Sequence, residues 1–261
     1  MENELQLLFS TQGVIGFLLV LTRISGMLTA APLFSTFPVP MQAKAILAIL
    51  TTFIMYPLVV HSSTFQPPTD IIMLTIMLSK ELCIGVLIGF CANLIFDAVQ
   101  IAGQLVSIQM GLSMAAAMDP LTKQQSPVIG QLFTFIACMV FIQLNAHHWL
   151  FSSIYDSYKS MPLGMNFDFT THIIPRLLYF TSQLFPVAFG IIMPIYVLLF
   201  LVDISLAFMA KMMPQMNIFM VAMPLKAGLG ISLILVFIAT TTIYLGHLIS
   251  NTLDNLKVIF S

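Results

Sequence analysis

The sequence contains very little charge. Only 7% of its 261 residues are Asp, Glu, Lys or Arg, whereas a soluble globular domain carries roughly 25%. The nine basic and ten acidic residues form no basic patch, which argues against a nucleic-acid partner. Hydrophobic residues make up 59% of the chain. The sequence therefore predicts an integral membrane protein.

Motifs of catalysis and metal binding are also missing. The sequence has no HExxH, GxSxG or GxxxxGK[ST] pattern, and no two carboxylates share a helix face. Cys83, Cys91 and Cys138 lie in apolar segments without a CxxC spacing, which indicates buried thiols rather than a disulfide or metal site. We therefore expect no enzyme, no cofactor and no metal site.

Long apolar segments dominate the chain. The first ten residues carry no Lys or Arg, so we expect no secretory signal and a retained first segment. Six apolar segments cover about residues 13–31, 41–60, 71–96, 128–151, 177–202 and 227–249. We expect residues 152–175 to hold the main polar loop. Clustered prolines predict that several helices are kinked or broken, in an all-α fold of helical hairpins.

Charged residues occur within these apolar segments or at their ends. They are Arg23, Lys80, Glu81, Asp203, Lys211 and Lys226. An uncompensated charge in hydrocarbon costs a few kcal/mol, and neighbours such as Lys80 and Glu81 do not face each other on a helix. We therefore expect these residues to contact partner subunits. A small transporter or proton channel is the alternative, with Glu81, Asp97 or Asp203 as its membrane carboxylate.

The segment MMPQMNIFMVAMP predicts a hairpin turn. Pro214 and Pro224 frame Gln215 and Asn217, whose side-chain amides can both donate and accept hydrogen bonds. We expect these two amides to pack on a neighbouring subunit.

Residues 97–127 combine polar and methionine side chains. Gln100, Gln104, Ser107 and Gly111 recur at steps of four, three and four, which places them in one stripe of a helix. Met110, Met114 and Met118 follow beside this stripe, and we expect Asp119-Pro120 to end the helix. Two interpretations stay open from the residues alone: a helix packed on its neighbours with Met as filler, or a segment that closes a channel.

Four motifs carry a family resemblance. IQMGLSMAAAMDP, LNAHHWL, MPLG and KMMPQMNIFMVAMPL occur in this order, together with Arg23 and PLFSTFPVP. They resemble the FliR family of flagellar type III export-gate proteins, whose virulence counterpart is SctT. Ala146 and Ala222 depart from the family pattern, since glycine is usual there. The resemblance implies a FliP-like part at about residues 1–181, a FliQ-like hairpin at about 182–251 and a short tail at 252–261.

The resemblance also implies a function. Family members are non-enzymatic core subunits that form, with FliP-like and FliQ-like subunits, the channel for unfolded flagellar proteins, and they contact an FlhB-like protein. The expected location is the bacterial inner membrane, as a multi-pass protein of the flagellar basal body. Residues 109–125 would form the pore-closing segment. Its pore residues would be Gln109, Met110, Gly111, Leu112, Ser113, Met114, Met118, Asp119 and Pro120. A virulence secretion subunit or a stand-alone transporter are the alternatives.

Overall fold

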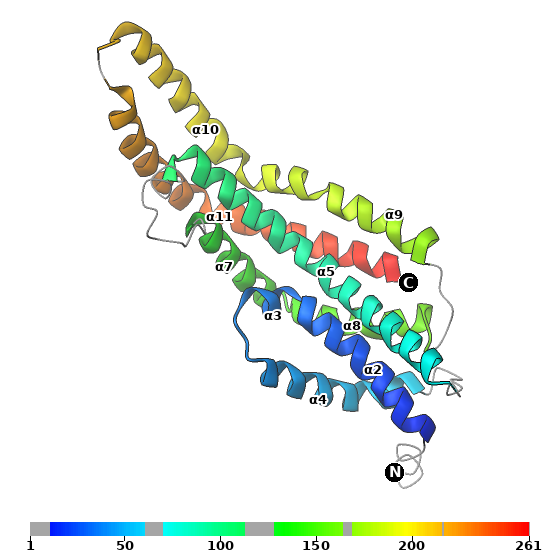
Figure 1. Cartoon of the computed structure of the whole chain (residues 1–261). Coiled ribbons are helices and arrows are strands. Elements are labelled where there is room, and N and C mark those ends of the chain that lie inside the picture. The colour runs from blue at the N-terminus through cyan, green and yellow to red at the C-terminus, as the bar shows by residue number, and fades with distance from the viewer. Residues whose placement is uncertain (1–10, 61–69, 113–127, 164–168, 216, 261) are drawn as a thin grey trace. The chain divides into compact units, whose positions relative to one another are not determined.

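A computed structural model describes residues 11–60, 70–112, 128–163, 169–215 and 217–260. All regular secondary structure in these ranges is helical (Figure 1). The helices are α2 (Thr11–Ala30), α3 (Pro32–Thr36), α4 (Met41–Val60), α5 (Ile71–Gln109), α7 (Val128–Gln143), α8 (Ala146–Ser160), α9 (Phe169–Ser182), α10 (Leu184–Met212) and α11 (Ile218–Phe260). The protein is an all-α integral membrane protein, as the sequence predicted.

Five of the described helices, or six if the broken pair α7 and α8 counts as one, are long and apolar enough to cross a membrane. The number agrees with the six predicted segments. The third segment and the first part of the Met-rich stretch that follows it form one continuous helix, so α5 has 39 residues and ends at Gln109. At 1.5 Å per residue it is about 58 Å long, well beyond the ~30 Å hydrocarbon core of a bilayer.

The segment at residues 152–175, which was expected to hold the main polar loop, is helical on both sides of the connection between α8 and α9. Helix α8 continues to Ser160 and α9 begins at Phe169, with Pro175 inside it. The predicted segment 128–151 is broken near Asn145, which has a left-handed φ of 53°. Asn tolerates this backbone region better than most residues. A short polar side chain at this position therefore allows α7 to end and α8 to begin within two residues.

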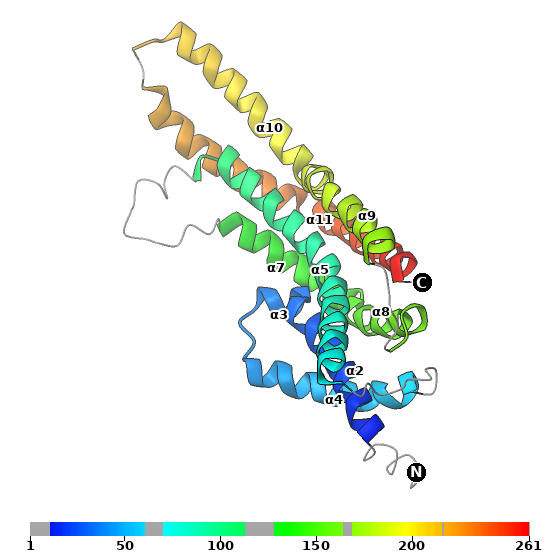
Figure 2. The ribbon, with the colours of Figure 1, turned by 45° about the vertical axis from the view of Figure 1, so that its right-hand side comes forward.

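The described residues divide into two compact units. The first comprises the described parts of residues 1–94, 145–180 and 251–261, and the second those of residues 95–144 and 181–250. These limits differ from the division into FliP-like and FliQ-like parts, which rests on the resemblance and stays a prediction. In the first unit, the short helix α3 reverses the chain so that α4 packs along α2 (Figures 1 and 2).

The second unit contains the α10–α11 hairpin, whose two arms are visible in both views (Figures 1 and 2). Its turn is shorter than predicted. Pro214 and Gln215 lie in the turn, whereas Pro224 lies inside α11. The predicted tail at residues 252–261 is also helical as far as Phe260. Proline inside α11 removes one backbone hydrogen bond, yet the helix continues through it.

Candidate functional site

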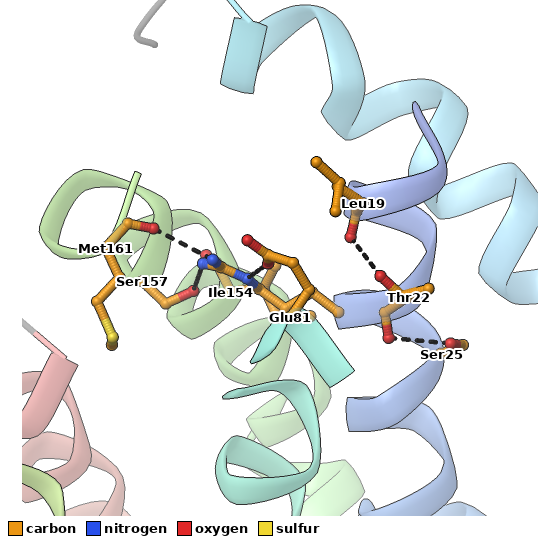
Figure 3. Close-up of polar contacts among 8 residues, drawn as sticks. Leu19, Thr22, Ser25, Glu81, Ile154, Ser157 and Met161 are labelled. Carbon is orange, nitrogen blue, oxygen red and sulfur yellow. Dashed lines mark hydrogen bonds and ion pairs between the residues drawn. The ribbon is translucent and has the colours of Figure 1, made fainter. Parts of the chain in front are cut away.

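Arg23 is the most deeply buried charged residue of the described chain. Its side chain is fully inaccessible, and Glu81 is only 4% exposed. The Nε of Arg23 donates to Oε2 of Glu81 at 2.5 Å. Figure 3 shows Glu81 of α5 with Ser157 and Met161, which belong to α8 and its C-terminal end. We call Arg23, Glu81, Ser157, Tyr158 and Met161 the Arg23 cluster.

The guanidinium of Arg23 uses each of its nitrogens. Nη1 donates to the Ser157 hydroxyl at 3.0 Å, and Nη2 donates to the Met161 carbonyl at 3.1 Å. The Ser157 hydroxyl in turn donates to the carbonyl of Ile154 at 2.6 Å. The Arg23 carbon Cζ lies 3.9 Å from the centre of the Tyr158 ring. A planar fork with fixed donors suits this arrangement, whereas a lysine ammonium could not reproduce it.

These contacts show that Arg23 and Glu81 do not need another subunit to neutralise their charges. Arg23 and Glu81 were expected to find their partners in other subunits, because nothing near them in sequence could neutralise them. Each has its counter-charge inside the same chain, 58 residues away. A buried pair that retains both partners avoids the large cost of a single buried charge. The additional subunit contacts of these two residues stay a prediction.

Small residues bring α2 and α5 close together beside the Arg23 cluster. A Cβ atom added to Gly85 would overlap the backbone carbonyl of Arg23, and one added to Gly89 would lie 2.6 Å from the Met27 carbonyl oxygen. The GxxxG step therefore places two helix backbones in direct contact, as such steps do in membranes. Glu81 lies one helical turn before Gly85, so this close approach of the two backbones brings its carboxylate within reach of the guanidinium.

A second charged cluster lies in the second unit. Asp203 of α10 forms an ion pair with Lys226 of α11 through Oδ1. Its other oxygen, Oδ2, accepts a hydrogen bond from Nε2 of Gln109 at 2.8 Å. The side chains of Lys226 and Asp203 are 19% and 33% exposed. We call Gln109, Asp203 and Lys226 the Asp203 cluster. As with Arg23, each charge has a partner within the chain itself, although the sequence led us to expect partner subunits. Contacts of these residues with other subunits stay a prediction.

The predicted pore residues are only partly described. Gln109 ends α5, Met110 is 1% exposed, and Leu112 is half-buried. Ser113, Met114, Met118, Asp119 and Pro120 lie outside the described residues. Helix α5 ends before the predicted stop at Asp119-Pro120, because Gly111 has a left-handed φ of 79°. Glycine commonly ends helices in this conformation, and its amide bonds the Ile108 carbonyl at 3.0 Å.

The predicted polar stripe does not have one uniform environment. Gln100 is exposed, Gln104 is half-buried and Ser107 is 3% exposed. The Ser107 hydroxyl has no hydrogen-bond partner within the described residues. Gly103, one turn before Ser107, lies in close contact with Gly130 of α7, so α7 packs against the face of α5 on which Ser107 is buried. Whether the stripe lines a wet space stays a prediction.

The remaining predicted contact residues lie at accessible positions. Lys80 is half-buried, and Gln215 and Asn217 are both exposed at the hairpin turn. Among the described residues there is no group of three His, Cys, Asp or Glu side chains that could hold a metal ion. Sequence reasoning missed Ser157 and Tyr158 as arginine partners. The MPLG motif was the one available signal, since its Met161 supplies the carbonyl that Arg23 bonds.

Comparison with known proteins identifies the family. The model of "Bacterial export proteins, family 1" matches residues 14–252. The chain belongs to this family of bacterial export proteins. The chain is similar to the Bacillus subtilis flagellar biosynthetic protein FliR, which is 30% identical over 92% of this chain and 93% of its own length. The Escherichia coli FliR is 28% identical over 92% and 91% of the two chains. These matches confirm the FliR resemblance.

A virulence relative is also similar, over a shorter range. The "Yop proteins translocation protein T" of Yersinia pestis is 28% identical over 70% of this chain and 69% of its own length. The chain is therefore similar to both flagellar and virulence proteins. The two flagellar relatives match over 92% of the chain, which supports the flagellar interpretation.

Proposed function

We propose that the chain is a core subunit of the flagellar type III export gate. In this function it forms, with FliP-like and FliQ-like subunits, the channel through which unfolded flagellar proteins leave the cell. The observation that carries the proposal is the similarity to flagellar FliR proteins over 92% of the chain. The gate lies in the bacterial inner membrane at the flagellar basal body, and an FlhB-like protein contacts it.

The function is structural rather than enzymatic. Two of the three carboxylates that a membrane transporter would use for proton transfer are held here in fixed pairs, Glu81 with Arg23 and Asp203 with Lys226. A paired and hydrogen-bonded carboxylate is a poor carrier, because losing its charge would leave the cation unpaired. This argument favours a gate subunit over a stand-alone proton channel.

Contacts with partner subunits use the accessible polar residues. Gln215 and Asn217 are exposed at the tip of the α10–α11 hairpin, and Lys80 is half-buried on α5. Long apolar faces of α10 and α11 are also exposed, including Phe208 at 67% and Val236 at 71%. These faces pack on lipid or on the FliP-like and FliQ-like subunits. Residues 109–125 reach into the export path and help to seal it at rest.

The test is complementation combined with co-purification. In a flagellated strain that lacks its own FliR-like protein, the chain should restore motility and the secretion of hook and filament proteins. In mild detergent it should co-purify with FliP-like and FliQ-like subunits. A monodisperse, protease-resistant chain that purifies alone, with no recovery of motility, would contradict the proposal.

The virulence alternative rests on the similarity to the Yersinia translocation protein. It is tested in parallel with a virulence-system deletion strain. Secretion of effectors there, without recovery of motility in the flagellar strain, would favour the alternative over the flagellar gate.

A further inference from the structure

The Asp203 cluster connects three helices rather than two. Helices α10 and α11 are strongly apolar, so an isolated Asp203 or Lys226 would be costly there. The ion pair between them satisfies this need within the hairpin alone. The bond from Gln109 is therefore an additional contact, which ties the C-terminal end of α5 to the hairpin. A neutral amide has no electrostatic need for this partner.

One face of α11 meets the end of α5. Met223, Lys226 and Gly230 are spaced three and four residues apart, so they share this face. Met110 fills the space at Gly230, where an added Cβ would lie 2.5 Å from the Met110 Cγ. A Cβ added to Gly111 would lie 4.0 Å from the Met223 Cγ. The end of α5 thus meets this stripe of α11 at Gly230 through Met110, and at Lys226 through Gln109 and Asp203.

We propose that Gln109, Asp203 and Lys226 are positioning residues that fix the end of α5 on the α10–α11 hairpin. The cluster sets the position from which the chain leaves α5 at Gly111. Gly230 contributes to the same contact, because any larger residue at this position would displace the Met110 side chain. The hydrogen bond supplies direction and the buried Met110 supplies apolar contact. Together they define one register between α5 and α11.

The experiment measures this register directly by disulfide formation. Met110→Cys and Gly230→Cys are combined in a full-length chain whose Cys83, Cys91 and Cys138 are replaced by alanine, in the assembled membrane complex. The first change removes the side-chain atoms that the new Cβ at position 230 would meet. The initial rate of oxidation is read by mass spectrometry of the linked peptides. We expect the disulfide between positions 110 and 230 to form rapidly in this chain, which serves as the parent for the variants below.

Gln109→Leu is the decisive variant. It removes the bond to Asp203 and leaves the ion pair intact. The equilibrium constant for this register should fall roughly tenfold, as expected for the loss of one hydrogen bond to a charged acceptor, and the disulfide rate should fall with the population in register. Lys226→Met should lower the rate further. Lys211→Met is the matched control, since it removes an exposed charge from the same hairpin two turns beyond Asp203, and its rate should equal the parent's.

The outcomes separate clearly. An unchanged rate in Gln109→Leu, with normal amounts of complex, would overturn the positioning role. Should Lys226→Met not accumulate, Gln109→Leu still decides, because its charges stay paired. The ion permeability of the resting gate is a second measurement, and its interpretation rests on the proposed function as an export-gate subunit. A slower disulfide with unchanged permeability would support the positioning role and contradict the sealing function of the adjoining segment.

Discussion

Arg23 illustrates what a single charge requires inside an apolar helix. Its burial is complete, and three directed hydrogen bonds and one aromatic ring surround the guanidinium. Because all of these partners come from α5, α8 and the residue after α8, the side chain holds three elements together. Removing the acceptor from Glu81 or Ser157 leaves a buried guanidinium N–H without its hydrogen bond. The residue is therefore a structural centre of the first unit.

Replacing Arg23 with methionine should destabilise the chain strongly. Glu81 would then be buried without a counter-charge, and breaking a buried pair in this way costs about 3–5 kcal/mol. Arg23→Lys should give an intermediate effect, because the charge is kept but the fork geometry is lost. The measurement is the amount of chain in the membrane and the thermal stability of the extracted complex.

Lys159→Met provides the control for this prediction. Lys159 forms an exposed pair with Asp156 at 3.0 Å, and its side chain is 58% exposed. Exposed pairs contribute little to stability, so this variant should behave as the parent. Equal losses in Arg23→Met and Lys159→Met would show that burial and hydrogen bonding do not distinguish the two cations.

At the scale of the helices, glycine decides which elements approach closely. Gly85 and Gly89 admit α2, and Gly103 meets Gly130 of α7. Gly228 of α11, in contrast, has open space around the position that a Cβ would occupy. The packing therefore requires glycine at positions 85 and 89, whereas no neighbour in the described chain requires it at position 228.

Gly85→Ala and Gly228→Ala should thus have opposite effects. The alanine Cβ at position 85 would overlap the Arg23 carbonyl and force the helices apart, a change that costs about 1–3 kcal/mol. At position 228 the same substitution should stabilise α11 by up to ~1 kcal/mol through helix propensity. Thermal unfolding of the purified complex measures both. A loss at position 228 as large as at position 85 would contradict this assignment.

The hairpin turn yields a separate prediction. Replacing Gln215 and Asn217 together with leucine should weaken co-purification of the partner subunits, because both exposed amides lose their hydrogen-bonding capacity. Gln42→Leu with Gln143→Leu is the matched control, since these exposed amides belong to other helices, α4 and α7. Unchanged yield of the complex and normal motility in the turn variant would count against the contact.

At the scale of the whole molecule, the closed state of the gate can be tested. Deleting Met114–Met118 should leave the complex assembled but allow small ions to cross the membrane, because an apolar constriction excludes ions by dewetting. Replacing Met114 and Met118 with leucine keeps the apolar volume and should keep the membrane tight. Conductance or ion-sensitive growth of cells with the full gate is the measurement. A tight membrane after the deletion would favour the simple packing interpretation.

Composition and periodicity predicted the membrane class, the number of apolar segments and the hairpin turn. They also indicated that Arg23 and Asp203 each need a partner. They could not identify the partners, because Arg23 bonds residues 58, 134 and 138 positions away. Gln109 likewise bonds a residue 94 positions away. The end of α5 before Gly111 was missed, because the sequence analysis placed the helix end at Asp119-Pro120 and gave the single glycine less weight.

The separation of the Arg23 partners has a consequence for synthesis in the cell. Glu81 follows Arg23 by 58 residues, but Ser157 follows it by 134. At ~5–20 residues per second, roughly 4–15 s pass between the appearance of Glu81 and that of Ser157. During this interval the guanidinium has its counter-charge but lacks its final acceptors on α8. Water, lipid headgroups or the insertion machinery must bond these donors, so α2 reaches its final state only after α8 has been made.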